Sequence, residues 1–208
     1  MDRRLTARGQ QRKDQLLAYG TARFAENGYH PTSVAEIVQG IGVGKGVFYW
    51  YFASKEEYFL EILRDAQRDL RRSQQAAIAN AATPIERIER GIRASIRWYG
   101  EHPELDTLVR FAASEERFAL ALRKGEDVAV ADVARHIKDA IAEGQVPDAD
   151  PVLLAHAMVG VTGQLVSRFP RDAGQEVHPV ADTAVSFSLH GLLGRDSGPA
   201  GPETQPAT

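Results

Sequence analysis

Hydrophobic residues recur at helical spacing along most of the chain, and this pattern predicts an all-α fold. The first periodic segment runs from Gln10 to Asn27, where the apolar positions are Leu16, Leu17, Phe24 and Ala25. The dipeptide Asn27-Gly28 tolerates the left-handed backbone conformation that often ends a helix. We therefore expect the first helix to end near Asn27.

Two further short helices are predicted directly after it. Ser33 and Glu36 form an S-x-x-E capping box, in which the hydroxyl and the carboxylate each accept a hydrogen bond from an unpaired backbone N–H. A second helix is expected from Ser33 to about Gly40. Gly42 permits the positive φ of a tight turn between helices, and a third helix then starts at Val43 or Gly44. Three helices in this order, joined by short turns, indicate a helix-turn-helix.

The third helix divides its aromatic residues between two roles. Phe48 and Phe52 are four positions apart and share one face, so we expect them in a small core with Leu16, Phe24, Ile37 and Ile41. Other faces carry side chains that can reach a phosphate or a base, namely Lys45, Val47, Tyr49, Trp50 and Tyr51. A core role for Tyr49 and Trp50 is the alternative for either residue taken singly. Likewise, Ser54-Lys55-Glu56 could be no more than a helix cap followed by solvated charges.

Long helices are expected beyond residue 55. They cover about residues 54–80, 85–99 and 116–143, with a break at His102-Pro103 and an interruption possible at Gly125. In the segment 85–99, the isoleucines and Tyr99 occupy one face, and a second face carries Gly91, Ala94, Ser95 and Trp98. A helix with two faces suited to burial belongs at the centre of a bundle.

The last two predicted helices, 151–167 and 179–194, are apolar almost all round. A helix that is apolar on every side must be buried on every side. In a chain of this length a second copy supplies the missing cover most simply, so we expect an isologous homodimer with a four-helix bundle at its interface.

Charge is distributed unevenly. Through Lys55 the chain has eight Lys and Arg against four Asp and Glu, a net charge of +4, which leaves −7 for the rest of a total of −3. A basic end joined to an acidic remainder is typical of a phosphate-binding module attached to another domain. Arg3, Arg4 and Arg8 could extend this basic surface as an N-terminal arm or could simply be solvated.

Several other functions are excluded by missing motifs. The glycines around Lys45 lack the spacing of a P-loop or of a dinucleotide fingerprint, and the six histidines form no H-E-x-x-H motif. We expect no catalysis, no metal and no cofactor. The chain has no cysteine, no apolar leader and no run of ~20 apolar residues, so a cytoplasmic protein that does not enter a membrane is expected. The tail 195–208, rich in Gly, Pro, Ser and Thr, is expected to be disordered.

The segment from Arg12 to Leu63 resembles the DNA-binding domain of TetR-type bacterial transcriptional regulators. The resemblance rests on F-A-E-N-G-Y at 24–29, T-S-V-A-E-I at 32–37 and G-V-G-K-G-V-F-Y-W-Y-F-A-S-K-E-E at 42–57. It implies contacts to double-stranded DNA from Thr32, Ser33, Lys45, Gly46, Val47, Tyr49, Trp50, Tyr51 and Lys55. Gly44 departs from the family pattern because it stands where Ser or Thr is usual, which removes one hydroxyl cap and contact.

These observations predict three regions: a helix-turn-helix domain over residues 1–55, a helical effector-binding and dimerisation domain over 56–194, and the tail. The expected function is a repressor that leaves a palindromic operator when a small apolar or aromatic ligand binds. Candidate ligand-binding residues are Trp98, Tyr99, His102, Arg110, Phe111 and Phe118. Two alternatives remain: a DNA-binding activator or an architectural protein without an effector, and simple core packing for any one of the aromatic residues.

Overall fold

The computed structural model describes residues 5–169 and 177–193, and within them the chain is helical with no strand. The helices are α1 (Ala7–Asn27), α2 (Val34–Gly40), α3 (Lys45–Tyr51), α4 (Lys55–Ile78), α5 (Pro84–Glu101), α6 (Pro103–Ser114), α7 (Glu116–Ala142), α8 (Pro151–Arg168) and α9 (Val177–Leu193). The all-α prediction is therefore confirmed. Arg3, Arg4 and the tail predicted to be disordered lie outside the described residues.

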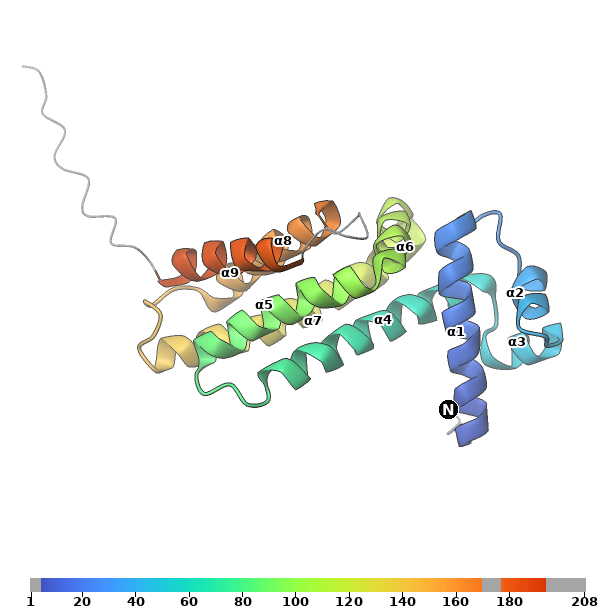
Figure 1. The fold of residues 1–208 in the computed structure, drawn as a ribbon, viewed down its shortest axis with the longest axis horizontal. Coiled ribbons are helices and arrows are strands. Elements are labelled where there is room, and N and C mark those ends of the chain that lie inside the picture. The colour runs from blue at the N-terminus through green and yellow to red at the C-terminus, as the bar shows by residue number, and fades with distance from the viewer. Residues whose placement is uncertain (1–4, 170–176, 194–208) are drawn as a thin grey trace, which may run out of the picture.

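The molecule has two ends (Figure 1). Helices α1 to α3 form one end, and α1 crosses the long bundle formed by the remaining helices. In that bundle α5 lies between α4 on one side and α9 on the other, and α7 packs beside it against α8. The prediction that the segment 85–99 is central is confirmed, since Ile88, Ile92 and Ile96 are buried together with Ala94, Ser95 and Trp98 from the second face.

Side-chain caps fix where several helices begin. The Ser33 hydroxyl accepts a hydrogen bond from the Glu36 N–H at 3.1 Å, and Ser54 caps α4 in the same way at Glu57. The second half of the predicted capping box at α2 is wrong. The Glu36 carboxylate instead accepts hydrogen bonds from Arg23 and Asn27 at the end of α1, and the Arg23 guanidinium supplies a charged donor that a backbone N–H does not.

Gly42 has φ +68°, as the predicted tight turn requires, and α3 follows with Gly44 as its N-cap. The third helix thus starts at Lys45, one residue after the later of the two expected starts, Val43 and Gly44. The interruption expected at Gly125 does not occur, since α7 is continuous through it. A Cβ at position 125 would lie 2.0 Å from Nε2 of Gln67, so this glycine allows α4 to approach α7 closely.

Two hydrophobic cores are present among the described residues. The first joins α1, α2 and α3 to the start of α4 and continues through Trp98, Leu105, Leu108 and Phe118. The second lies between α5, α7, α8 and α9. The domain boundary predicted at residue 55 stays a prediction, because the first core runs across it. No helix within the described ranges is long and apolar enough to cross a bilayer.

Candidate functional site

The outer surface of α3 presents the most exposed aromatic side chains of the helix-turn-helix. Tyr49 and Trp50 each leave 54% of their surface open, and Lys45, Gly46 and Val47 are exposed beside them. They face outward because Phe48 and Phe52 turn the opposite side of the helix into the core, where both are buried. The predicted division between core and surface is therefore observed for Phe48, Phe52, Tyr49 and Trp50, but not for Tyr51.

Lys45 supplies a cation on this surface that has no internal partner. Its side chain takes part in no hydrogen bond or ion pair with the rest of the described chain. Gly44, the preceding residue, makes no side-chain cap, so the departure from the family pattern has the expected structural effect. An ammonium group that is exposed and unpaired can neutralise a phosphate without first breaking an intramolecular contact.

Tyr51 faces away from this surface and toward α1. Its hydroxyl donates a hydrogen bond to the Gly9 carbonyl oxygen at 2.8 Å, and the Trp50 ring packs against it edge-on with a centroid distance of 4.6 Å. Tyr51 therefore links the end of α3 to the start of α1, and the Trp50 ring packs against the Tyr51 ring.

Thr32 and Ser33 are also engaged within the protein. The buried Thr32 hydroxyl donates to the Gly28 carbonyl oxygen at 2.8 Å, and the exposed Ser33 hydroxyl caps α2. These two residues set the geometry of the segment between α1 and α2. Of the pair, only Ser33 is accessible from outside.

Lys55 holds the same segment from the other side. Its Nζ donates to the carbonyl oxygens of Tyr29, His30 and Thr32 at 2.9, 3.3 and 3.0 Å. Burial and the neighbouring Arg117 cation lower the pKa of Lys55, whereas the three carbonyl dipoles favour its charged form. With its three donors directed inward, this ammonium group stabilises the helix-turn-helix itself.

The six candidate ligand-binding residues do not meet in one cavity. Phe111 and Phe118 belong to an aromatic cluster with Tyr29 and Phe59, in which Tyr29 stacks on Phe111 at 5.2 Å and lies edge-on to Phe118 at 5.4 Å. Phe118 is fully buried there. The Arg117 guanidinium covers both Tyr29 and Phe118, with distances of 5.1 and 4.9 Å to the ring centroids.

This aromatic cluster joins the two ends of the molecule, because Tyr29 follows α1 whereas Phe111, Arg117 and Phe118 come from α6 and α7. Sequence reasoning did not identify Tyr29 and Arg117. Tyr29 lies in the N-G-Y part of the family motif, which gave some indication of its importance, but the pattern around Arg117 gave none.

The other four candidates line two separate grooves. Trp98 and His102, whose rings stack at 4.4 Å, lie on a groove of about 920 Å³ where α1 meets α4, α5 and α6. Tyr99 and Arg110 lie on a smaller groove of about 370 Å³ toward α8, where Arg110 pairs with Asp106. The larger groove also carries Asp69, whose Oδ2 accepts the Trp98 indole hydrogen bond at 2.8 Å, and this bond and Arg72 lower the pKa of Asp69.

Comparison with known proteins agrees with this architecture. Residues 16–62 match bacterial regulatory proteins of the TetR family. The HTH-type transcriptional repressor KstR2 of Mycobacterium tuberculosis is 35% identical over 91 residues, which cover 44% of this chain and 46% of KstR2. The match therefore spans about half the length of that relative.

Solved structures extend the similarity to the whole fold. A TetR-family regulator from Syntrophomonas wolfei superimposes with a TM-score of 0.79 at 22% identity, over 89% of this chain and 96% of that one. The structure of the ketosteroid transcriptional regulator KstR2 of M. tuberculosis gives a TM-score of 0.67 at 25% identity, over 88% and 96% of the two chains.

A helix-turn-helix followed by a helical bundle is the architecture of the TetR-family regulators to which the chain is similar. Residues 16–62 carry the segment that the tetR family of bacterial regulatory proteins shares, and the fold of the whole chain is that of solved TetR-family regulators.

Proposed function

We propose that this protein is a homodimeric transcriptional repressor that binds a palindromic DNA operator and leaves it when a small, largely apolar molecule binds. The observation that carries the proposal is the α3 surface, where Lys45, Tyr49 and Trp50 are exposed on a helix that a buried face holds in place. Cationic and aromatic side chains on one such surface suit the phosphates and base edges of a major groove.

The proposed dimer is supported by the exposed face of α8 and α9. Leu153 and Phe187 leave 68% and 66% of their surfaces open, and Val152 and Leu193 are exposed on the same two helices. Gly160 and Gly163 face open space in the single chain, which leaves room for another helix to approach. A second copy placed against this face buries these apolar residues and sets two α3 helices on one duplex.

Response to a ligand is supported by the groove between α1 and the bundle. Its volume of about 920 Å³ is within the range typical of small-molecule sites. KstR2, a relative, is described as a ketosteroid regulator, which fits an apolar effector for proteins of this kind. This groove favours a ligand-responsive regulator over an activator or architectural protein that has no effector.

Selection of bound duplexes from a random DNA pool tests the DNA-binding proposal. We expect an enriched inverted repeat whose half-sites lie about 10–10.5 base pairs apart, or a multiple of that spacing, since a two-fold dimer presents its two helices to successive major grooves. A double variant, Lys45→Ala with Tyr49→Ala, changes only exposed side chains and is expected to lose the enrichment. Recovery of no common sequence by the parent protein overturns the proposal.

A further inference from the structure

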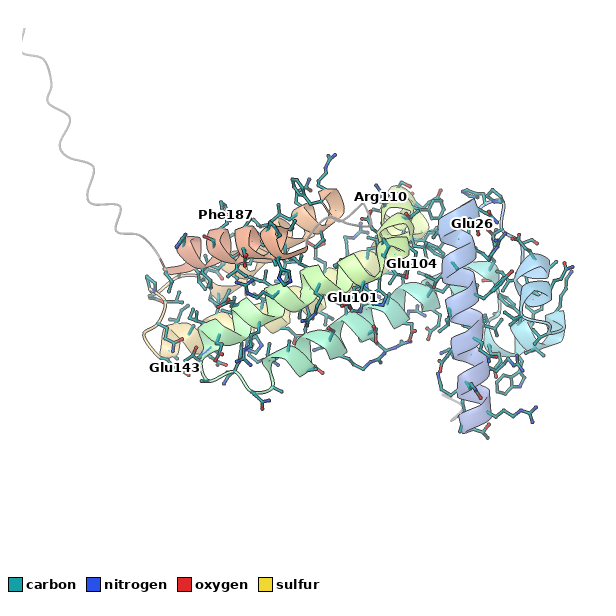
Figure 2. The ribbon with its side chains drawn as sticks, in the orientation of Figure 1. Glu26, Glu101, Glu104, Arg110, Glu143 and Phe187 are labelled. Carbon is teal, nitrogen blue, oxygen red and sulfur yellow. The ribbon has the colours of Figure 1, made fainter. Side chains whose placement is uncertain are left out.

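The groove beside α1 is shared by the two ends of the molecule. One wall is the face of α1 that carries Asp14, Ala18, Ala22 and Glu26, and the other walls come from α4, α5 and α6. Figure 2 shows Glu26 on α1 and Glu104 near the start of α6, on the elements that face each other there. A molecule bound in this groove contacts α1 of the helix-turn-helix and the helical bundle at the same time.

The floor of the groove is apolar and already packed. It consists of Leu17, Ile62, Trp98 and Leu105, each less than 9% exposed. On the α1 wall three of the lining residues are alanines, at positions 18, 22 and 25. The alanines on one wall and the packed residues below them leave a space that the protein itself does not fill. The apolar floor of this space suits a hydrocarbon or aromatic group.

The rim has a strong excess of negative charge. Five carboxylates line the groove, Asp14, Glu26, Asp65, Asp69 and Glu104, against Arg72 as the one guanidinium or ammonium among the lining residues. Arg72 pairs with Asp69, and Arg23 and Arg68 pair with Glu26 and Asp65 from outside the groove. Asp14 on α1 accepts a hydrogen bond from Gln10 at 2.7 Å but forms no ion pair within the described chain, and Glu104 on α6 forms none either.

We propose that this groove is the effector site of the protein and that it takes an organic cation, an amine or quaternary ammonium group carried on an apolar body. The apolar body lies on the floor formed around Trp98, and the cation lies among the carboxylates of the rim. Asp14 on α1 and Glu104 on α6 supply negative charges there that no internal cation neutralises. An anion is repelled by the same carboxylates. This assignment rests on the proposed function and adds the position and charge of its ligand.

Binding at this position changes the relation between α1 and the bundle. The two acidic walls repel each other when the groove is empty and are drawn to a common cation when it is filled. A ligand shifts a conformational equilibrium only through its different affinities for the two states. One wall belongs to α1 and the others to the bundle. The affinity for the ligand therefore depends on the distance between α1 and the bundle.

The first experiment measures binding without DNA. Phenyltrimethylammonium is the probe, tert-butylbenzene its uncharged isostere and benzoate its anionic counterpart. The fluorescence of Trp98 reports binding in a Trp50→Phe variant, which leaves a single tryptophan in the chain. We expect saturable binding of the cation, with the isostere and benzoate at least tenfold weaker. Equal binding of the cation and its isostere, or no saturable signal from the cation at concentrations up to about 10 mM, overturns the proposal.

Matched variants locate the cation. Glu104→Gln and Asp14→Asn each remove one negative charge from one wall with little change of shape. Glu101→Gln, only three residues before Glu104, removes the same charge from a position that does not line the groove. We expect each wall variant to weaken phenyltrimethylammonium about fivefold, the effect of one partly exposed ion pair, and Glu101→Gln to leave it within twofold. An equal loss of affinity for phenyltrimethylammonium in all three variants contradicts the proposed position of the site.

The last measurement separates this proposal from the proposed function. Operator affinity of the protein with Trp50 intact is measured with and without the probe. Weaker DNA binding in the presence of the probe, absent in Glu104→Gln at the same concentration, supports the effector assignment. Tight probe binding with unchanged operator affinity overturns it. Failure to bind any DNA sequence when no probe is present contradicts the proposed function instead, and the binding titrations then still decide whether the groove takes a cation.

Discussion

The Nζ atom of Lys55 lies 4.4 Å above the centroid of the Tyr29 ring. The lysine is the first residue of α4, and the tyrosine belongs to the segment between α1 and α2. A cation over an aromatic ring adds to the three hydrogen bonds that the same ammonium group donates to backbone carbonyls. The contact holds the helix-turn-helix at the point where α4 leaves it.

Substitution of Lys55 by methionine removes these donors and keeps the length of the apolar stem. We expect the free energy of unfolding to fall by about 1.5 kcal/mol or more, because hydrogen bonds from a charged donor are lost and the partly buried carbonyl groups of Tyr29 and Thr32 are left without this partner. Urea denaturation measures the change. A variant as stable as the parent contradicts the stabilising role of Lys55.

Lys45→Met is the matched change on the exposed surface of α3. Because Lys45 makes no internal hydrogen bond or ion pair, the stability of this variant is expected to stay within about 0.5 kcal/mol of the parent. The slope of log affinity against log salt is expected to fall by about one per subunit, the value for loss of one phosphate contact. Lys55→Met is expected to leave that slope unchanged. If Lys55→Met lowers the slope and Lys45→Met does not, then Lys55 and not Lys45 contacts the phosphates.

The local features of the helix-turn-helix could be predicted from the sequence because they depend on near neighbours. Phe48 and Phe52 share a face through helical periodicity alone, and the positive φ of Gly42 follows from the tight turn. The three acceptors of Lys55 could not be predicted, since they lie 23 to 26 residues earlier in the chain. Nothing local to Lys55 separates an inward-facing ammonium from one that reaches a phosphate.

The candidate ligand-binding set was divided for a geometric reason. Trp98 and Tyr99 are adjacent in sequence, but neighbouring side chains on a helix are about 100° apart, and they lie on different grooves. Helix order brought Phe111 and Phe118 near to this region, yet their rings pack with Tyr29 at the junction with α1. The contribution of α1 to the larger groove could not be predicted from the sequence, because it depends on how α1 packs across α4 and α6.

Glu61 gives the stability a dependence on pH. Burial raises the pKa of its carboxyl, but Lys13 and Arg68, at 2.7 and 3.0 Å, outweigh this and leave the pKa below its ordinary value of 4.5. A carboxyl with a lowered pKa in the folded state stabilises the protein at neutral pH, and this contribution is lost as the pH falls through that lowered pKa. We expect Glu61→Gln to be less stable at pH 7 and to lose less stability below about pH 4.5 than the parent.

Thermal unfolding measured at several pH values checks the Glu61 prediction. Glu126→Gln provides the control, since Glu126 is exposed on α7 and makes no ion pair within the described chain. Identical acid sensitivity of the parent and Glu61→Gln counts against the bridge between α1 and α4 as a source of stability.

Gly20 lets α1 and α4 cross closely. A Cβ at this position would lie 1.8 Å from the hydroxyl oxygen of Tyr58, which is fully buried and donates its hydrogen bond to the Leu16 carbonyl oxygen. We expect Gly20→Ala to lower the free energy of unfolding by about 1–3 kcal/mol through overpacking. Gly91→Ala, where a Cβ meets nothing within 4 Å, is expected to gain about 0.5–1 kcal/mol from helix propensity. Denaturation curves of the two variants decide the matter.

The dimer prediction concerns the face of α8 and α9. Leu153→Glu places a charge on an exposed apolar residue, so the single chain keeps its fold while a charge is buried without a partner in the proposed interface. We expect the parent to sediment as a dimer at micromolar concentration and this variant as a monomer. Leu120→Glu, on the 54% exposed Leu120 of α7, is expected to remain dimeric. A monomeric parent eliminates the interface.

Helix α4 has 24 residues, and at a rise of 1.5 Å per residue its length is about 36 Å. Its first residue, Lys55, is hydrogen-bonded to the segment between α1 and α2, and α4 then packs against α5. A tilt of about 5° about the far end moves the near end by about 3 Å, close to the 3.4 Å step between base pairs along each strand. A tilt of about 5° is therefore enough to shift an attached helix by about one base pair along the DNA.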